Sequence, residues 1–330
     1  MGKAVRMADI AERLNISVES VSKALAGKRG VSEEMRAKVV ALAKELGYES
    51  SKVSKEHSGN IAVLISDRFF SGNGFYTNLF RFLTLKGSAA GFTFIMDIVS
   101  QETERNCVQP TLVADRKVEA IVFMGNFELT YLRAVLTCGL PFLFLDFHIP
   151  GYGKNSITSD NLDGGFQLTK HLLAQGWRKI GFVGSTWATS SIMGRYMGYQ
   201  WALQTENLTP KKEWLIDDRD ENGALIPLDL PEKLPQAFLC SCDDVAYYLI
   251  EILQKRGLRV PEDIAVCGYD DVRSALPSRL PLTTYQVNVE GMAEATIKQL
   301  QQKFTEGQAD AVSCIVPGHL VVRNSTEKPE

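Results

Sequence analysis

From residue 61 onward, the chain alternates short apolar runs with longer segments of mixed polarity. Runs of this length, rich in Val, Ile, Leu and Phe, are typical of strands buried on both faces of a parallel sheet. The segments between them are long enough for the helices that connect parallel strands. The runs form two groups, which predict two doubly wound α/β lobes. They are IAVLI (61–65), FTFIMDI (92–98), AIVFM (120–124) and FLFLD (142–146), then IGFVG (180–184), EWLID (213–217), AFLC (237–240) and DIAVCGY (263–269).

The first 48 residues have a helical pattern instead. Between residues 7 and 14, apolar side chains recur at the spacing of one helix face. Asn15 tolerates the left-handed conformation, so it can end this helix and turn the chain. Ser17 is placed to cap a second helix, whose inward residues include Val21 and Leu25. Two helices joined by about three residues predict a helix-turn-helix.

A third helix is expected after Ser32, with apolar residues reaching Leu46 and Gly47 ending it. Three short helices bury little surface, so this unit could be a plain three-helix bundle. The alternative is a bundle that presents its second helix to another molecule. The outward face of that second helix decides between the two.

Most side chains on this outward face are short, which would let the helix enter a DNA major groove. Glu19 could accept from a cytosine amino group, and Val18 could pack on a thymine methyl. Ser20 and Ser22 could contact base edges or phosphates, whereas the basic residues are placed for phosphates. The residues expected to bind DNA are Ser17, Val18, Glu19, Ser20, Ser22, Lys23, Lys28, Arg29 and Arg36.

The segment VRMADIAERLNISVESVSKALAGKRGVSEEMRAKVVALAKELGY, residues 5–48, resembles the DNA-binding headpiece of the LacI/GalR (lactose-repressor) family of bacterial transcription regulators. The resemblance rests on D-I-A, on I-S before the second helix, on V-S-K-A-L, on V-S before the third helix and on the ending E-L-G-Y. The family more often has glycine at the position of Asn15. Because asparagine also adopts the left-handed conformation, this departure does not weaken the resemblance.

Residues 49–60, ESSKVSKEHSGN, are polar and lack apolar periodicity, which indicates a linker. In the family this stretch usually forms a hinge helix on operator binding, and a leucine of that helix wedges into the minor groove. Here the matching positions hold Ser54 and His57, and the leucine is missing. Either the DNA is kinked less, or Val53 or His57 acts differently. His57 could equally be a solvated linker residue.

The resemblance continues through SDNLDGGFQLTKHLLAQGWRKIGFVG, GRYMGYQWAL, GLRVPEDIAVCGYDD and PLTT, which are similar to the family's effector-binding core. That core is like the periplasmic sugar-binding proteins, and its topology implies three crossings between lobes, near residues 176, 288 and 318. The expected domains are therefore a headpiece (1–48), a linker (49–60) and a core (61–330). Within the core, lobe one is 61–176 with 289–317, and lobe two is 177–288 with 318–330.

One stretch departs from the family. Between Trp214 and Phe238 family members ordinarily have a full helix. Here the sequence DDRDENGALIPLDLPEKLPQ (217–236) contains three prolines, which leave little room for regular helix. We expect a loop on this side of lobe two.

The ligand site is expected beyond the carboxyl ends of the strands, as in other open α/β sheets. Aromatic faces and charged groups in such a cleft suit a small polyol. Asp146 and Trp187 are candidates for this site by position. The residues that we predict to bind the effector are Asp67, Phe69, Phe75, Tyr76, Phe147, Asp160, Ser191, Arg195, Arg219, Asp243, Asp270 and Tyr285.

Arg195 and Asp270 are the preferred pair, because both match positions where the family contacts its effector, although a structural salt bridge would explain them too. Phe75 and Tyr76 could stack on the effector or pack in the core. Asp160 could instead cap a helix that begins near Asn161. Cys242 stands where many relatives have asparagine, so one donor to the effector is missing.

Composition indicates the kind of partner, the compartment and the state of the cysteines. Residues 1–59 carry eleven Lys and Arg against eight Asp and Glu, a net +3, so the rest of this −3 chain carries −6. A basic end on an acidic body suits contact with nucleic acid at that end. No apolar run is long enough for a signal peptide or a membrane span, so we expect a cytoplasmic protein. The six cysteines lack CxxC spacing and histidine partners, so we expect reduced thiols and no metal or cofactor.

Two other classes of function fit the sequence less well. An enzyme is disfavoured because the chain has no GxSxG, P-loop, GxGxxG or HExxH motif, and adjacent carboxylates such as 270 and 271 point to opposite faces of a strand. A sugar-binding protein alone would not carry the headpiece. The resemblance thus implies a homodimeric transcriptional regulator, expected to be a repressor. It would bind a pseudo-palindromic double-stranded operator under the control of a small effector, expected to be a sugar or sugar derivative.

Overall fold

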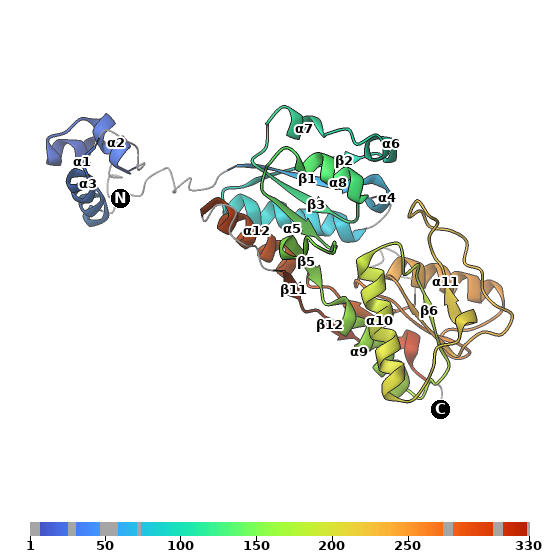
Figure 1. Ribbon diagram of the computed structural model, residues 1–330. Helices are drawn as coiled ribbons and strands as arrows, with labels where there is room; N and C mark the ends of the chain where they lie inside the picture. The colour runs from blue at the N-terminus through green and yellow to red at the C-terminus, as the bar shows by residue number, and fades with distance from the viewer. Residues whose placement is uncertain are drawn as a thin grey trace. The chain divides into compact units, whose positions relative to one another are not determined.

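The computed structural model describes residues 7–25, 31–46, 59–70, 74–272, 280–305 and 313–328 (Figure 1). The chain divides into two compact units, Met1–Glu56 and His57–Glu330. Within the described ranges, none of the helices is long and apolar enough to cross a bilayer. The linker predicted at 49–60 lies almost wholly outside the described residues, as do Gly27, Lys28, Arg29 and Gly47.

The smaller unit contains three helices, α1 (Met7–Leu14), α2 (Val18–Leu25) and α3 (Glu33–Glu45). Their core contains Ile10, Val21 and Val39, each fully buried, so each helix contributes its apolar face. The predicted turn is confirmed, because Asn15 has φ 50°. The Ser17 hydroxyl accepts from the Ser20 amide at 3.0 Å, which confirms the predicted cap of α2.

The larger unit begins with a six-stranded parallel sheet in the order β11-β5-β4-β3-β1-β2. Helices α5 and α12 pack on one face through residues such as Leu79 and Met292, which share a core with Val63. Helix α8 covers the other face, where Leu132 packs with Leu64. The strands are β1 (Asn60–Ser66), β2 (Thr93–Val99), β3 (Ala120–Met124), β4 (Phe142–Leu145), β5 (Ser156–Ser159) and β11 (Cys314–Val316). The helices are α4 (Asp67–Phe70), α5 (Gly74–Ala89), α6 (Gln101–Arg105), α7 (Thr111–Ala114), α8 (Leu129–Leu136) and α12 (Val289–Thr305), with the 3-10 turn η1 (Gly153–Asn155).

A second, four-stranded parallel sheet has the order β7-β6-β8-β9. Helices α9 and α10 cover one face, where Leu168 and Tyr199 pack with Phe182. Helix α11 covers the other, where Leu249 packs with Val183. The elements are α9 (Asn161–Ala174), β6 (Ile180–Val183), α10 (Ser190–Thr205), η2 (Lys212–Trp214), β7 (Leu215–Ile216), β8 (Ala237–Cys240), α11 (Asp243–Lys255), β9 (Ala265–Cys267) and η3 (Asn324–Thr326).

The chain crosses between the two sheets after β5, after β10 (Thr284–Gln286) and before β12 (His319–Val321), which pairs antiparallel with β10. The first crossing differs from the one predicted near residue 176, because α9 already lies beside α10 (Figure 1). Two glycines permit this close approach: a Cβ at Gly165 or Gly198 would collide with the backbone of the other helix. Lobe two therefore begins at about residue 160, which is where the structure first departs from the predicted boundaries.

The segment predicted to lack a helix indeed has none. Residues 217–236 contain only an antiparallel bridge between Arg219 and Leu225 and a few turns. The prolines at 227, 231 and 235 explain this, because each removes a backbone donor.

Candidate functional site

The outward face of α2 is one of two candidate sites. Val18 is 48% exposed, and Ser17 and Glu19 are exposed beside it. Ser20, Ser22 and Lys23 are half-buried on the same helix. The face is thus accessible and carries short side chains, although the Ser17 hydroxyl is already engaged as the cap.

Three of the predicted DNA contacts, Glu19, Lys23 and Arg36, have partners within the headpiece. The Lys23 ammonium lies 2.8 Å from the Glu19 carboxylate, and this lysine lowers the pKa of Glu19. Arg36 donates from Nη1 to the Ala24 carbonyl at 3.1 Å, which ties α3 to the last turn of α2. Arg36 therefore has a structural role besides any phosphate contact.

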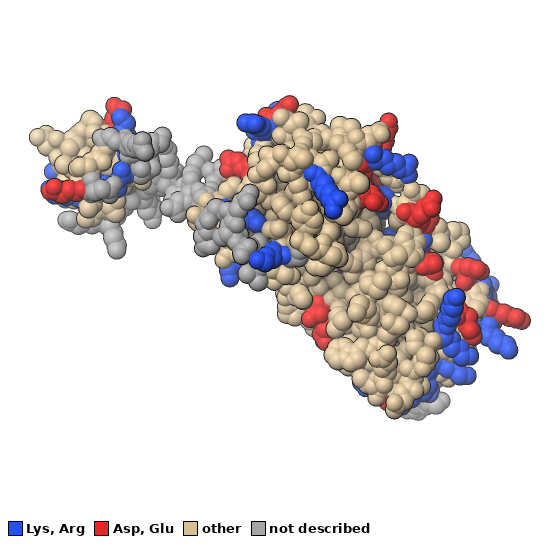
Figure 2. Space-filling model, in the orientation of Figure 1, with Lys and Arg blue, Asp and Glu red and all other residues tan. Residues whose placement is uncertain are grey.

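On the face of the larger unit drawn in Figure 2, Lys and Arg side chains are scattered among Asp and Glu side chains over a mostly uncharged surface.

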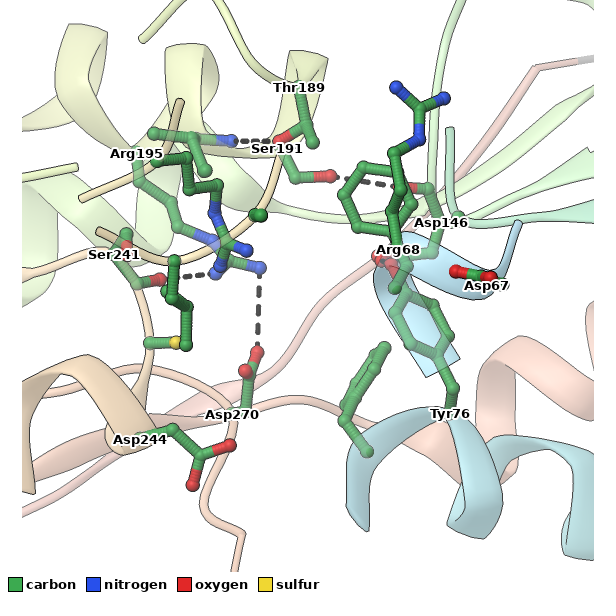
Figure 3. A pocket seen from close by; sticks show the side chains of 18 of the residues that line it. Asp67, Arg68, Tyr76, Asp146, Thr189, Ser191, Arg195, Ser241, Asp244 and Asp270 are labelled. Atoms are coloured by element: carbon green, nitrogen blue, oxygen red, sulfur yellow. Dashed lines mark hydrogen bonds and ion pairs between the residues drawn. The ribbon is translucent and has the colours of Figure 1, made fainter. Parts of the chain in front are cut away.

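The second candidate site is a cavity of about 530 Å³ between the two lobes. It lies beyond the carboxyl ends of β1, β3, β4 and β8, where ligands of open α/β sheets bind. Figure 3 shows that side chains of both lobes line it, such as Tyr76 of lobe one and Arg195 of lobe two. Eight of the predicted effector-binding residues line it, together with the candidate Asp146: Asp67, Phe69, Phe75, Tyr76, Ser191, Arg195, Arg219 and Asp270.

Arg195, from α10, is 5% exposed, and its guanidinium contacts four other residues. Its Nε donates to the Asn161 side chain at 2.9 Å and its Nη1 donates to the Ser241 carbonyl. Nη2 lies 3.4 Å from Asp270 Oδ1, and the guanidinium stacks over the Tyr269 ring. The planar group is thus fixed in one orientation at the cavity wall.

Asp146 follows β4 with φ 70° and is 6% exposed. Its Oδ2 accepts from the Tyr76 hydroxyl at 2.9 Å, and its backbone carbonyl accepts from the Ser191 hydroxyl at 2.9 Å. Among the described residues, its Oδ1 has no hydrogen-bond partner. A buried acceptor without a donor costs free energy, so this atom is where a donor from a ligand would be most useful.

Both buried carboxylates hold protons more tightly than usual. Burial raises the pKa of Asp146 to about 6, against the opposing charge of Arg195. Burial also raises the pKa of Asp270 to about 7, again opposed by Arg195. The cavity therefore contains two acceptors whose charge is poorly solvated without a bound donor.

Phe75 and Tyr76, which were expected either to stack on the effector or to pack in the core, lie in the core at the edge of the cavity. Both are buried in the core of lobe one, with ring centroids 5.1 Å apart in an edge-on arrangement. Both also line the cavity.

Four predicted effector-binding residues lie outside the cavity walls, and each has a structural explanation. Phe147 is fully buried and packs on Phe144, with ring centroids 4.9 Å apart. Asp160 caps α9 by accepting from the Asp163 amide, as the alternative interpretation held.

Asp243 is buried and accepts from the Thr284 hydroxyl at 2.7 Å. Tyr285 stacks on Tyr269 and accepts from the Gly318 amide at 2.9 Å. The candidate Trp187 is 54% exposed and is not among the cavity residues.

Other lining residues were not predicted. Some directly follow strands, as Ser241 follows β8, so the strand-end rule could have found them. Ala224 and Leu225 come from the loop 217–236, where no strand-end signal exists. The lining residues that the sequence did not predict are Arg68, Gln101, Gly125, Thr189, Ile192, Ala224, Leu225, Ser241 and Asp244, whereas Cys242 was expected at the effector site.

Comparison with known families gives two matches. Residues 6–51 match the family described as "Bacterial regulatory proteins, lacI family". Residues 169–326 match the family described as "Periplasmic binding protein-like domain". The two matches lie in the headpiece and in the core, respectively.

Curated relatives align over almost the whole chain. The HTH-type transcriptional repressor PurR of Pectobacterium carotovorum is 26% identical over 328 residues, covering 96% of this chain and 95% of that protein. The Ribose operon repressor of Haemophilus influenzae is 23% identical over 327 residues, covering 97% and 98%. Both relatives are named as repressors rather than as enzymes.

Solved structures share the fold. A transcriptional regulator CelR–cellobiose complex superposes with a TM-score of 0.69 at 23% identity, covering 97% of this chain and 99% of that one. A lac repressor dimer bound to operator and the anti-inducer ONPF superposes with a TM-score of 0.66 at 24% identity, covering 98% and 99%. With a headpiece that matches the lacI family of bacterial regulatory proteins, a core that matches the periplasmic binding protein-like domain and repressor relatives along its length, the chain combines a LacI-type helix-turn-helix domain with a periplasmic-binding-protein-like domain.

Proposed function

We propose that this protein is a homodimeric transcriptional repressor that binds a pseudo-palindromic operator. A small uncharged polyol, a sugar or sugar derivative, bound in the cavity between the lobes controls its affinity for DNA. The protein acts in the cytoplasm and catalyses no reaction. The observation that carries the effector part of the proposal is the buried Asp146 Oδ1, which has no donor among the described residues.

The headpiece supports the DNA-binding part. Helix α2 presents Val18, Glu19 and Ser22 on a face with short side chains, while Val21 is fully buried on the opposite face. Such a helix can approach the floor of the major groove, where donor and acceptor patterns distinguish base pairs. Two headpieces in a dimer would double the phosphate contacts and the base contacts.

The charges of the cavity support an uncharged ligand. Four carboxylates line it, Asp67, Asp146, Asp244 and Asp270. Three guanidinium groups oppose them, but Arg68 is already paired with the buried Glu104 at 2.9 Å. A phosphate or carboxylate would therefore meet an excess of negative charge, whereas hydroxyl groups could donate to the carboxylates.

The position of the cavity supports control of DNA binding. The two lobes are connected by three crossing segments, and the residues that line the cavity come from both lobes. A ligand that binds both walls favours one relative orientation of the lobes, and the headpieces of a dimer follow that orientation.

Two measurements test this proposal. A duplex selected by the full-length protein from a random library should be retarded in a gel, and unrelated duplex should compete poorly. A calorimetric screen of neutral mono- and disaccharides should find a ligand that binds the wild type and binds Asp146→Ala at least about tenfold more weakly. A protein that selects no duplex, or a saccharide that binds both proteins equally, would contradict the corresponding part.

A further inference from the structure

Residues 218–226 form a hairpin in the segment where family members ordinarily have a helix, and we call it the strap hairpin. Arg219 bridges antiparallel to Leu225, and the Ile226 amide donates to the Asp218 carbonyl at 3.0 Å. At the tip, the Gly223 amide donates to the Asp220 carbonyl at 2.8 Å. Asp at the first position of a turn and a left-handed Gly at the fourth, here with φ 79°, are typical of a tight hairpin end.

The base of the strap hairpin is fixed to lobe two. Asp218 is fully buried and accepts from the Ser185 amide at 2.8 Å and from the Ser241 hydroxyl at 2.7 Å. The Ser185 hydroxyl in turn accepts from the Arg219 amide at 2.9 Å. The hairpin therefore projects from a rigid point beside β6 and β8.

The tip of the strap hairpin contacts lobe one. Arg105, at the end of α6, donates to the Asn222 side-chain oxygen at 2.8 Å. Arg68, in α4, donates to the Asn222 backbone carbonyl at 3.3 Å. Asn222 thus accepts from two arginines of the opposite lobe.

Arg68 is itself held in place for this contact. Both of its bonds to Glu104, to Oε1 and to Oε2, measure 2.9 Å. Glu104 is 2% exposed and also accepts from the Glu128 amide. The arginine that contacts the strap hairpin is therefore anchored to a buried carboxylate of lobe one.

The strap hairpin also forms part of the cavity wall. Arg219, Ala224 and Leu225 line the cavity together with Arg68 and Phe69 of lobe one. Leu225 is 59% exposed, which places it where the wall meets solvent. One hairpin thus borders the cavity, begins in one lobe and ends on the other.

We propose that the strap hairpin closes the effector cavity, with the contact of Asn222 to Arg68 and Arg105 holding it shut. This inference rests on the proposed function only in taking the cavity as the effector site. An effector enters or leaves when Asn222 separates from lobe one. Asn222 and Arg105 are positioning residues, because neither lines the cavity.

A thiol in the cavity can report this closure without any effector or DNA. Cys242 lines the cavity and is 8% exposed, and burial raises the pKa of Cys242 to about 12. Its alkylation by N-ethylmaleimide therefore requires opening of the cavity. The rate can be followed at each cysteine by mass spectrometry of the full-length protein.

The experiment compares wild type with Asn222→Ala and Arg105→Ala. A matched control is Arg178→Ala, which removes an exposed arginine that pairs with Glu206 of lobe two, away from the strap hairpin. The partly exposed Cys138 and Cys314 serve as standards within each protein, and the core residues Cys240 and Cys267 report global unfolding.

We expect Asn222→Ala and Arg105→Ala to speed alkylation of Cys242 by about fivefold each, the effect of losing one hydrogen bond. Rates at Cys240 and Cys267, and all rates in Arg178→Ala, should stay as in wild type. Unchanged alkylation of Cys242 in both variants, or equal acceleration at all three buried thiols, would overturn the proposal. Because the measurement needs no operator, its failure is distinct from a failure to bind DNA.

Discussion

The guanidinium carbon of Arg195 lies 3.7 Å from the centroid of the Tyr269 ring, and Tyr269 is fully buried. This stacking fixes the plane in which Arg195 donates to Asn161, Ser241 and Asp270. The centre of the cavity wall is therefore a packed ionic cluster, and several of its properties can be tested.

Replacing Arg195 should destabilise the fold as well as the site. Arg195→Met leaves Asp270 buried without its cation, and breaking a buried ion pair from one side costs about 3–5 kcal/mol. We expect a loss of this order in the free energy of unfolding, measured by urea titration at pH 7.5. In Arg195→Met/Asp270→Asn part of the loss should return, because no unpaired charge remains. A double variant as unstable as the single one would show that the charge is not the cause.

The raised pKa values predict how stability changes with pH. Asp270, with a pKa of about 7, and Asp146, with a pKa of about 6, bind protons more tightly folded than unfolded. Their contribution to the free energy of unfolding is therefore largest below about pH 4, and it is lost as the pH rises through 6 and 7. Urea unfolding between pH 5 and pH 8 should show stability falling with pH, and less steeply in Asp270→Asn.

Asp263→Asn provides the control for that series. Asp263 is paired with Arg259, and this pair lowers its pKa to about 2, outside the tested range. Its replacement should leave the change of the free energy of unfolding between pH 5 and pH 8 as in wild type. A slope that changes equally in both variants would contradict the assignment to Asp270.

The close packing of α9 on α10 can be tested at Gly198. A Cβ there would collide with the Leu162 carbonyl oxygen. Gly198→Ala should lower the free energy of unfolding by about 2–3 kcal/mol, because overpacked cores must shift their backbone. The neighbouring Met197 is 50% exposed, so Met197→Ala should have little effect in the same urea titration. Equal stability of the two variants would contradict the contact.

On the headpiece, Glu19→Ala should relax the preference for one base pair of the selected duplex by about tenfold. Lys28→Ala, at a position outside the described residues, should weaken binding to all duplex sequences alike, because a phosphate contact carries no sequence information. Binding to a panel of single-base variants of the duplex measures both. Identical profiles for the two variants would be incompatible with the roles assigned to them.

Much of this architecture was predictable because its signals are local. Apolar runs such as 61–65 and 120–124 are buried strands whichever neighbours they pair with. β5 and β11 were missed because Ser156–Ser159 and Cys314–Val316 are short, and β5 is largely polar. Their strand character comes from pairing, β5 with β4 and β11, and β11 with β5 across a distant part of the chain.

The site was predictable in part for the same reason. Residues that follow strands, such as Asp67 and Asp146, reach the cavity because parallel strands end at one edge. The same rule misplaced Phe147, which packs on Phe144, and Asp243, whose buried carboxylate accepts from Thr284. The strap hairpin could not be placed, because the turn sequence DENG predicts a hairpin end but not the lobe that its tip contacts.

Control of DNA binding by an effector can be tested most directly by measuring the affinity of the full-length protein for its selected duplex. Fluorescence anisotropy at fixed salt would be recorded with and without the saccharide identified by calorimetry. We predict that this saccharide changes the Kd of the wild type by at least about fivefold and changes that of Asp146→Ala far less at the same concentration. An unchanged Kd for wild type that is saturated with the saccharide would contradict control of DNA binding through the cavity.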